Sequence, residues 1–323
     1  MKEEKRKLIV LLGPTASGKT ALSLLLSELL PLEIVSADSR QIYKYLDIGT
    51  AKPTPEELNK VKHHFISIIN PDEYYSAGMF AKEASEVINN IFKNRKFPLV
   101  VGGSGLYIKA LCEGLFEGHY DENIKKKYKN QLLKLKSQFG IDYLYEQLKS
   151  IDPEAANMYP DKNPSRILRA LEHYYITGNK FSSSLKNIPK PAFEPFYIGL
   201  LTDRQTLYSR INQRTDIMWK NGLLEETKNI LDRGYSPDLN SLNTVGYKEC
   251  IALLRGEITE SIAIEKIKQH TRNYAKRQMT WFKKITNVHW IKNDDNSLKN
   301  TYNLVKKVLD FLKILLVTNY LLN

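Results

Sequence analysis

The chain contains one segment that constrains its fold more than any other, Gly13-Pro14-Thr15-Ala16-Ser17-Gly18-Lys19-Thr20. The segment has the spacing G-x-x-x-x-G-K-[ST] and lies between an apolar run typical of a strand and an apolar stretch typical of a helix. In that context the spacing predicts a P-loop, in which glycines let backbone N–H groups turn inward and the helix N-terminus adds partial positive charge. We expect all eight residues to bind phosphate groups. Lys19 would neutralise the outer phosphate, and the Thr20 hydroxyl would bind Mg²⁺.

Two further strands are predicted to end at the same edge as this loop. The strand 32–36 runs into Ala37-Asp38-Ser39-Arg40-Gln41, and the strand 97–101 runs into Gly102-Gly103-Ser104-Gly105-Leu106-Tyr107. Ligands of open α/β sheets bind at the carboxyl ends of the strands. Many P-loop NTPases carry a magnesium-binding carboxylate at the end of such a strand, so the Gly-Gly-Ser-Gly ending counts against ordinary NTP hydrolysis. The predicted fold is α/β, a P-loop NTPase-like parallel sheet with a helical insertion domain.

The insertion is predicted at residues 119–195, between core segments 1–118 and 196–323, because lysine-rich amphipathic helices replace the strand pattern there. Asn163 before Pro164 marks the start of one of these helices. On that helix we expect one apolar stripe and one polar face. The stripe comprises Leu168, Leu171 and Tyr175, and the polar face comprises Arg166, Arg169 and His173.

Two basic stretches follow the insertion. Arg204, Arg210 and Arg214 lie on a predicted helix after the strand 196–201, where they either clamp a phosphate or form a solvated face. On a predicted helix over 262–284, Ile267, Tyr274 and Trp281 are expected to face the core, beside a stripe that includes Arg272 and Lys276. Basic residues interleaved with aromatic ones suit RNA, although a solvated surface helix would look similar.

The amino-acid composition indicates the class of partner and the cellular compartment. The 323 residues carry a formal net charge of +12, which suggests a polyanionic partner. Cys112 and Cys250 are expected to be buried free thiols of a cytoplasmic protein, and no segment is long and apolar enough to suggest a membrane span, 314–323 included. His63 to Ile68 is predicted to form a short strand, in which the adjacent histidines point to opposite faces and bind no common metal.

Several blocks together resemble the tRNA dimethylallyltransferase family over nearly the whole chain. They are GPTASGKT at 13–20, SADSRQIY at 36–43, DIGTAKP at 47–53, GGSGLY at 102–107, SRILRALE at 165–172, GLLEE at 222–226, VGYKE at 245–249 and YAKRQMTWF at 274–282. The chain is similar to the bacterial type, because it has no C-x-x-C pair for the zinc finger that eukaryotic members often carry.

This resemblance implies transfer of a dimethylallyl group from dimethylallyl diphosphate to the exocyclic amine of the adenosine 3′ to the tRNA anticodon. The implied partners are the tRNA anticodon stem-loop and dimethylallyl diphosphate, with Mg²⁺ as cofactor and the chain acting as a monomer. The expected catalytic residues are Asp38, Thr15, Lys19 and Arg214. The expected tRNA contacts are Asp38, Ser39, Arg40, Gln41, Ser104, Ser165, Arg166, Ile167, Leu168, Arg169, Arg272 and Lys276.

Without the resemblance, two other functions fit the same residues. A P-loop kinase of a small metabolite or nucleotide would use the loop and the arginines but not the basic aromatic helix. An RNA-binding NTPase switch would use both without transferring a group. Asp38 likewise has three candidate roles: a general base toward the amine, a helix cap and a magnesium ligand.

Overall fold

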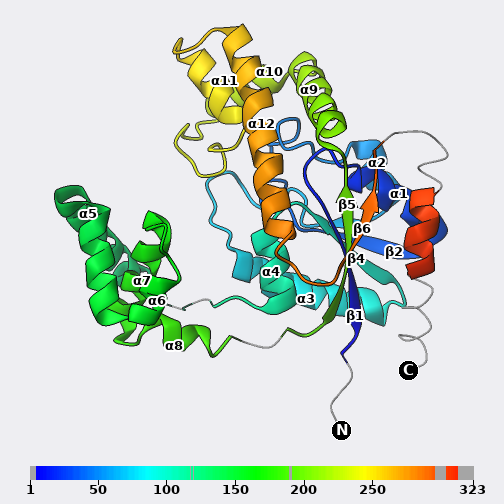
Figure 1. The fold of residues 1–323 in the computed structure, drawn as a ribbon. Coiled ribbons are helices and arrows are strands. Elements are labelled where there is room, and N and C mark those ends of the chain that lie inside the picture. Colours follow the sequence, from blue (N-terminus) through cyan, green and yellow to red (C-terminus); the bar gives the residue numbers. More distant parts are fainter. Residues whose placement is uncertain (1–4, 117, 119, 189–190, 295–302, 312–323) are drawn as a thin grey trace. The chain divides into compact units, whose positions relative to one another are not determined.

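The structure, a computed structural model, describes residues 5–116, 118, 120–188, 191–294 and 303–311 (Figure 1). The chain divides into two compact units. One consists of Met1–Glu113 with Pro191–Asn323, and the other is Gly114–Lys190. From the sequence, the second unit is expected at residues 119–195, and in the structure it is Gly114–Lys190. Each unit is described separately below.

The first unit is built on a six-stranded parallel sheet with the strand order β3-β2-β4-β1-β5-β6. The strands are β1 (Lys7–Leu12), β2 (Leu32–Ser36), β3 (His63–His64), β4 (Phe97–Gly102), β5 (Glu194–Leu201) and β6 (Val288–Lys292). Central β1 pairs with β4 through Val10 and Val100, and with β5 through Leu11 and Ile198. The predicted parallel α/β core is confirmed, and the segments after β1, β2 and β4 meet at one edge.

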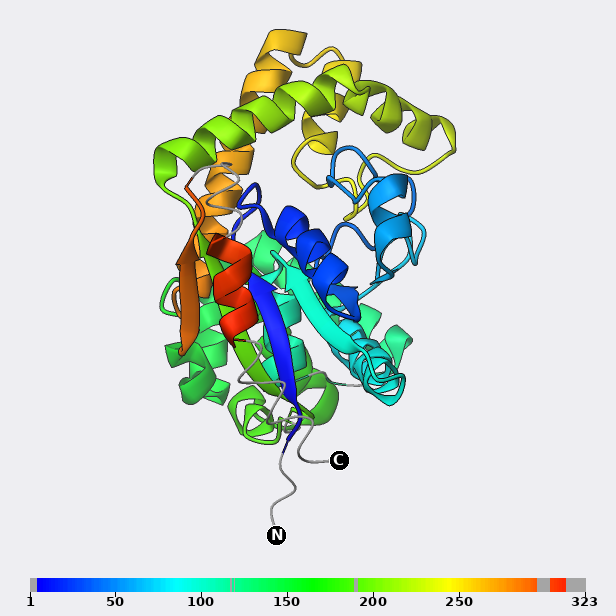
Figure 2. The same ribbon diagram turned by 90° about the vertical axis from the view of Figure 1, so that its right-hand side faces the viewer.

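Besides the helix at residues 303–311, the described part of this unit contains eight helices, and four of them lie beyond the carboxyl ends of the strands. These four, α9 to α12, stand above the sheet in all three views, and α9 crosses above α1 (Figure 2). The helices are α1 (Lys19–Leu29), α2 (Pro55–Lys60), α3 (Ala77–Lys93), α4 (Gly105–Glu113), α9 (Arg204–Lys220), α10 (Leu223–Asp232), α11 (Tyr247–Leu254) and α12 (Glu260–Phe282).

Local capping explains where two of these helices begin. The Ser76 hydroxyl accepts the Met79 N–H at the start of α3. The Asp203 carboxylate accepts the N–H groups of Gln205 and Thr206 at 2.9 and 3.1 Å, which starts α9 directly after β5. This cap fixes the helix that carries the three arginines.

Two expectations about strands are corrected. The strand expected over His63 to Ile68 is only two residues long, because Phe65 and Ser67 have φ angles of 65° and 53°, which no strand accommodates. The edge strand β6 is not anticipated by the sequence pattern. Its exposed His289 and Trp290 mask the alternation, since an edge strand buries little of its surface.

The expected core stripe of α12 is also wrong in part. Ile267 is buried, but Tyr274 is only half-buried and Trp281 is 36% exposed. A spacing of seven residues drifts by about 20° per repeat around a straight helix, so Tyr274 and Trp281 turn progressively away from the buried side of Ile267. The buried residues of α12 are Ala263, Ile267, Ala275, Gln278 and Phe282.

The described part of the C-terminal tail is a helix at residues 303–311, for which the sequence offered no account. Leu304 and Val308 are buried in the same apolar cluster as Leu24 and Ile291, so this helix covers part of the sheet. The apolar segment 314–323 lies outside the described residues. Across the described ranges, no helix has the length and apolar character needed to cross a membrane. Cys112 and Cys250 are buried free thiols, as predicted.

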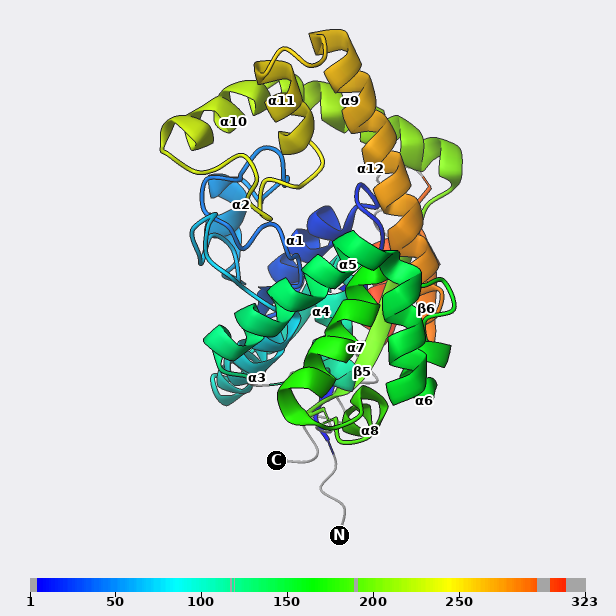
Figure 3. The same ribbon diagram turned by 90° about the vertical axis from the view of Figure 1, so that its left-hand side faces the viewer.

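The second unit consists of α5 (Glu122–Ile151), α6 (Pro153–Asn157), α7 (Pro164–Thr177) and α8 (Phe181–Leu185) (Figure 3). Gly140, with a φ of 79°, interrupts α5 and divides it into two helical segments. Asn163 caps α7 as predicted, by accepting the Arg166 N–H.

The face expected to carry His173 in this unit is corrected. His173 is 3% exposed and hydrogen-bonds Tyr120 and Ser184. Burial lowers the pKa of this imidazole, so it is a neutral core residue.

Candidate active site

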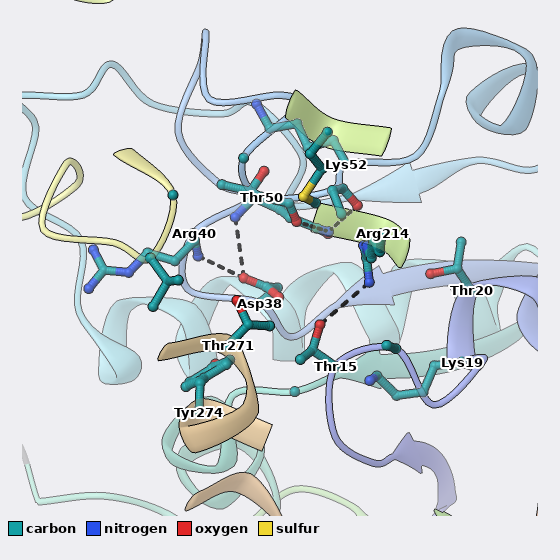
Figure 4. A pocket seen from close by; sticks show the side chains of 18 of the residues that line it. Thr15, Lys19, Thr20, Asp38, Arg40, Thr50, Lys52, Arg214, Thr271 and Tyr274 are labelled. Carbon is teal, nitrogen blue, oxygen red and sulfur yellow. Dashed lines mark hydrogen bonds between the residues drawn. The ribbon is translucent and has the colours of Figure 1, made fainter. Parts of the chain in front are cut away.

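A pocket of about 860 Å³ lies in the first unit, at the carboxyl edge of the sheet (Figure 4). Its walls come from the P-loop, the turn after β2, the loop 49–53, helix α9, the segment 243–246 and helix α12. These segments are far apart in the sequence. The parallel strand order brings the first two together, and the helices beyond the sheet supply the rest.

The P-loop takes its shape from a glycine and from a residue that sequence reasoning missed. Gly18 has a φ of 92° at the start of α1, and a Cβ there would lie 2.5 Å from Asn293 Nδ2. That Asn293 amide donates to the Ser17 carbonyl at 2.8 Å, and Asn293 N donates to the Leu201 carbonyl at 2.7 Å. The end of β6 thereby holds the P-loop against the end of β5.

Lys19 is held against the P-loop backbone. Its Nζ donates to the carbonyls of Gly13 and Pro14 at 2.9 and 2.8 Å. The pKa of Lys19 is lowered to about 7 by burial, which outweighs the opposing charge of Asp38, and the nearby Arg214 acts in the same direction as burial. A bound phosphate anion in place of these carbonyls would stabilise the protonated form of the amine.

Asp38 lies at the end of β2 with its carboxylate facing the pocket (Figure 4). Its Oδ1 accepts the N–H groups of Arg40 and Gln41 at 2.8 and 3.4 Å. Asp38 therefore caps a turn, not a helix, because residues 39–42 form turns. Within the described ranges Oδ2 accepts no hydrogen bond, which leaves one carboxylate oxygen for a ligand.

The three arginines of α9 separate into different environments. Arg214 lines the pocket, and its Nη1 donates to Thr15 Oγ1 at 3.4 Å. Arg210 also lines the pocket and donates to the Asn293 carbonyl at 3.1 Å. Arg204 lies over the Tyr208 ring at 5.1 Å and is not among the pocket-lining residues. Geometry thus favours Arg214 and Arg210 over Arg204 for a phosphate at this site.

The remaining residues of the turn after β2 have structural partners. Gln41 Nε2 donates to the carbonyls of Thr50 and Ala51 at 3.2 and 3.0 Å, which joins this turn to the loop 49–53. Arg40 extends away from Asp38 and donates to the Asn240 carbonyl at 2.6 Å (Figure 4). Ser39 lines the pocket as well. Ser104 binds the Ala37 carbonyl through its N–H but is not among the lining residues.

Helix α12 supplies the wall beside Asp38. Thr271 and Tyr274 point toward that carboxylate from α12 (Figure 4). Burial raises the pKa of Tyr274, and the charge of Asp38 raises it further, so the phenol stays protonated. An aromatic face and a carboxylate at one wall suit a planar base that carries an amine.

Gln278, also on α12, is a second residue that sequence reasoning missed. It is 6% exposed, its Oε1 accepts the Thr15 N–H at 2.9 Å, and its Nε2 donates to the Gly103 carbonyl at 2.9 Å. The sequence feature that could have identified Gln278 is its place in the block 274–282, which carries part of the family resemblance. A glutamine at a buried helix position requires partners, but the pattern does not name them.

Glu226 on α10 is the third missed residue. Its carboxylate accepts the backbone N–H groups of Asp47, Ile48 and Gly49 at 3.0, 2.8 and 3.1 Å, and the Tyr247 hydroxyl at 2.7 Å. It fixes the start of the loop that carries Thr50 and Ala51. Its membership in the block 222–226 could have identified it from the sequence, although the block does not indicate which residues it contacts.

The predicted RNA contacts fall in both units. In the first unit, Arg272 donates to Asn212 Oδ1 at 2.7 Å, and Lys276 is exposed on α12. In the second unit, the expected contact at Ile167 is corrected, because the whole residue is buried and no part of it is exposed to RNA, and Leu168 packs against the same core. Ser165 and Arg166 are exposed on α7, Arg166 lies over the Tyr159 ring, and Arg169 donates to the Phe116 carbonyl.

The donor set of the pocket fits Mg²⁺ only in company with phosphate. Thr20 lines the pocket and is exposed. In the part of the chain that the structure describes, no three His, Cys, Asp or Glu residues gather as a metal site. Mg²⁺ is often held by few protein ligands together with substrate phosphates and water, so Thr20 suits a magnesium–diphosphate ligand.

Known proteins are similar to this chain in sequence and fold. The profile of a family described as IPP transferase matches residues 41–285. The tRNA dimethylallyltransferase of Thermoanaerobacter sp. (strain X514) is 43% identical over 311 residues, which cover 95% of this chain and 97% of that protein.

Two solved structures extend the likeness. The tRNA delta(2)-isopentenylpyrophosphate transferase of Staphylococcus epidermidis has a TM-score of 0.68 and 38% identity, over 96% of this chain and 99% of that one. A eukaryotic dimethylallyltransferase acting on tRNA has a TM-score of 0.79 and 27% identity, over 95% of this chain and 80% of that one. This chain belongs to the IPP transferase family, together with curated tRNA dimethylallyltransferases.

Proposed function

We propose that this protein is a tRNA dimethylallyltransferase, which transfers a dimethylallyl group from dimethylallyl diphosphate to the exocyclic amine N6 of a tRNA adenosine. One observation carries the proposal: a single pocket holds a P-loop for the diphosphate and, across from it, a carboxylate with an oxygen available to an amine. A kinase or an NTPase would also use the P-loop, and its carboxylate would bind Mg²⁺ or a substrate hydroxyl, whereas Asp38 beside the aromatic wall of α12 suits a purine amine.

The chemistry assigned to these side chains is a displacement at carbon. The amine lone pair forms the bond to C1 of the dimethylallyl group while the C1–O bond breaks, and that electron pair leaves with the diphosphate. Asp38 accepts one amine proton, which helps because the lone pair is delocalised into the ring. Lys19 and Arg214 stabilise the negative charge that develops on the departing diphosphate, as preorganised donors do.

Mg²⁺ is part of the proposal through Thr20, whose hydroxyl would hold the ion beside the diphosphate. The ion would supply additional neutralisation of the leaving group. The Thr15 hydroxyl, held by Arg214 at 3.4 Å, would be a neutral donor at the same end of the pocket. Asp38 is not required as a magnesium ligand in this arrangement, because its Oδ1 serves the turn and its Oδ2 is assigned to the amine.

The proposed RNA substrate is the anticodon stem-loop, modified at the adenosine 3′ to the anticodon. That base must leave its stack to reach a pocket, and loop bases do so at low cost. The exposed cations of α12 and α7 would contact its phosphates. We propose that the chain acts as a monomer in the cytoplasm.

The test is to incubate the protein with Mg²⁺, unmodified tRNA and dimethylallyl diphosphate labelled in the prenyl group. We expect label in the RNA at one adenosine. With the Asp38→Asn variant, we expect no label at short reaction times. Phosphate transfer from ATP to a small molecule, with unlabelled RNA, would instead support a kinase. RNA-stimulated release of phosphate from NTP without labelled RNA would support a switch.

A further inference from the structure

Gln278 joins two loops that the proposed reaction needs in register. Its amide accepts from the Thr15 N–H of the P-loop and donates to the Gly103 carbonyl of the β4–α4 loop, both at 2.9 Å. The side chain is 6% exposed and lines the pocket wall between these loops. We propose that Gln278 is a positioning residue, which fixes Thr15 for its contact with the diphosphate; the inference rests on the proposed function.

The two bonds require an amide and fix its orientation. The Thr15 N–H needs an acceptor and the Gly103 carbonyl needs a donor, so Oε1 and Nε2 cannot exchange places. The site is also closed to larger neighbours, because a Cβ at Gly103 would lie 2.3 Å from Gln278 Nε2. Both partners are backbone groups, so their positions are what the side chain controls.

The consequence for chemistry runs through Thr15. Its backbone is held by Gln278, and its hydroxyl accepts from Arg214 Nη1 at 3.4 Å. Without Gln278, the half-buried Thr15 N–H would lose its protein acceptor, and the P-loop backbone would be free to shift. A displacement of about 1 Å in a positioned group can cost roughly a hundredfold in rate, so the effect should appear in kcat.

Replacing Gln278 by glutamate gives a test in which pH controls the hydrogen-bonding pattern of the side chain. In Gln278→Glu, the protonated carboxyl has the hydrogen-bonding pattern of the amide, because its carbonyl accepts from Thr15 and its hydroxyl donates to Gly103. The ionised carboxylate faces the Gly103 carbonyl with no donor. Burial and that carbonyl raise the glutamate pKa above its usual value, so lowering the pH from about 8 to about 6 should restore function.

Other titratable groups line the same pocket, and their contribution to the pH dependence must be removed by comparison with the parent. Tyr274 faces Gln278 from the same helix, while Lys19 of the P-loop, Asp38 after β2 and Arg214 of α9 line the same pocket. The quantity to measure is therefore the ratio of variant to parent single-turnover transfer rates at each pH, at saturating substrates. Gln269→Glu, an exposed change on the same helix, is the matched control.

We expect the Gln278→Glu ratio to be about a hundredth at pH 8 and to rise at least about tenfold by pH 6, with the Gln269→Glu ratio flat near one. Hydrogen-exchange mass spectrometry of the peptide containing Thr15 should show faster exchange than the parent at pH 8 and parent-like exchange at pH 6. A ratio that stays constant with pH, or a variant that equals the parent throughout, overturns the positioning role.

Failure of the proposed function would look different. In that case the parent itself transfers no label, while the exchange measurement still reports whether Gln278 holds Thr15. Parent-like exchange of the Thr15 peptide in Gln278→Glu at both pH values would reject the inference without reference to activity.

Discussion

The Glu226 carboxylate accepts the hydroxyl of Tyr247 at 2.7 Å and, with its other contacts, holds three consecutive N–H groups of residues 47–49. Tyr247 is fully buried, and its ring lies so close to Gly49 that a Cβ there would come within 2.5 Å. Helices α10 and α11 are thereby fastened to the loop 49–53. That loop, through Gln41, braces the turn that presents Asp38.

Glu226→Gln should weaken this fastening. One of the two oxygens becomes an NH₂ group that faces backbone donors, and charge-assisted hydrogen bonds are worth about 1.5–3 kcal/mol each, so we expect a loss of about 2 kcal/mol in the free energy of unfolding. Hydrogen exchange at the amides of 47–49 should accelerate. Glu225→Gln, exposed on the same helix, should change neither quantity. Unchanged protection of 47–49 in Glu226→Gln would contradict the arrangement.

Asp38→Asn should separate capping from proton transfer. The asparagine Oδ1 can still accept the Arg40 N–H, so the turn and the melting temperature should be preserved. Because an amide cannot take the amine proton, single-turnover transfer should slow by at least about a hundredfold, with near-parent affinity for tRNA and for diphosphate. Transfer at the parent rate would exclude the general-base role.

Lys19→Ala should slow transfer by about 10²–10³, the usual cost of losing one preorganised charge at a leaving group. The lowered pKa of Lys19, about 7, adds a second signature. At pH 8 the amine is mostly neutral, and bound diphosphate raises its pKa, so binding should take up a proton. Calorimetry in buffers of different ionisation enthalpy measures this uptake. Equal uptake in Lys19→Ala would assign the proton to another group.

The same pKa shift predicts how the stability of the free protein depends on pH. Between about pH 7 and 10.5, the unfolded chain holds the Lys19 proton and the folded protein has released it. Since the unfolded state then binds more protons, the free energy of unfolding should rise with pH across this window. Denaturant titrations of the parent and of Lys19→Met should diverge there, because the methionine variant lacks this contribution. Parallel curves would show that the folded-state pKa is not lowered.

Lys276→Ala should reduce the salt dependence of tRNA binding. Each lost phosphate contact removes about one unit from the slope of log K against log salt, and dimethylallyl diphosphate affinity should be unchanged. Arg272→Ala should act in the same direction, although it also breaks the bond to Asn212. Lys93→Ala, exposed on α3, is the control. A parent-like slope in Lys276→Ala would remove this residue from the RNA surface.

Much of the fold was predictable because it depends on local patterns. The P-loop spacing, the buried strands 32–36 and 97–101 and the cap at Asn163 each act within a few residues, and all are present as expected. The failures have a common cause. The exposed edge strand β6 and the heptad taken for the core face of α12 depend on what packs against them, which the local sequence does not contain.

The sequence by itself determined that strands 1, 2 and 4 end in a phosphate loop, a carboxylate turn and a glycine-rich turn, since strand direction and residue type settle where such groups lie. Only the tertiary structure decided which distant side chains complete the site. Arg214 was separated from Arg204, and Gln278, Asn293 and Glu226 found backbone partners 175 to 276 residues away in the chain. A buried polar side chain announces that it needs a partner, but only the folded chain brings one within hydrogen-bond distance.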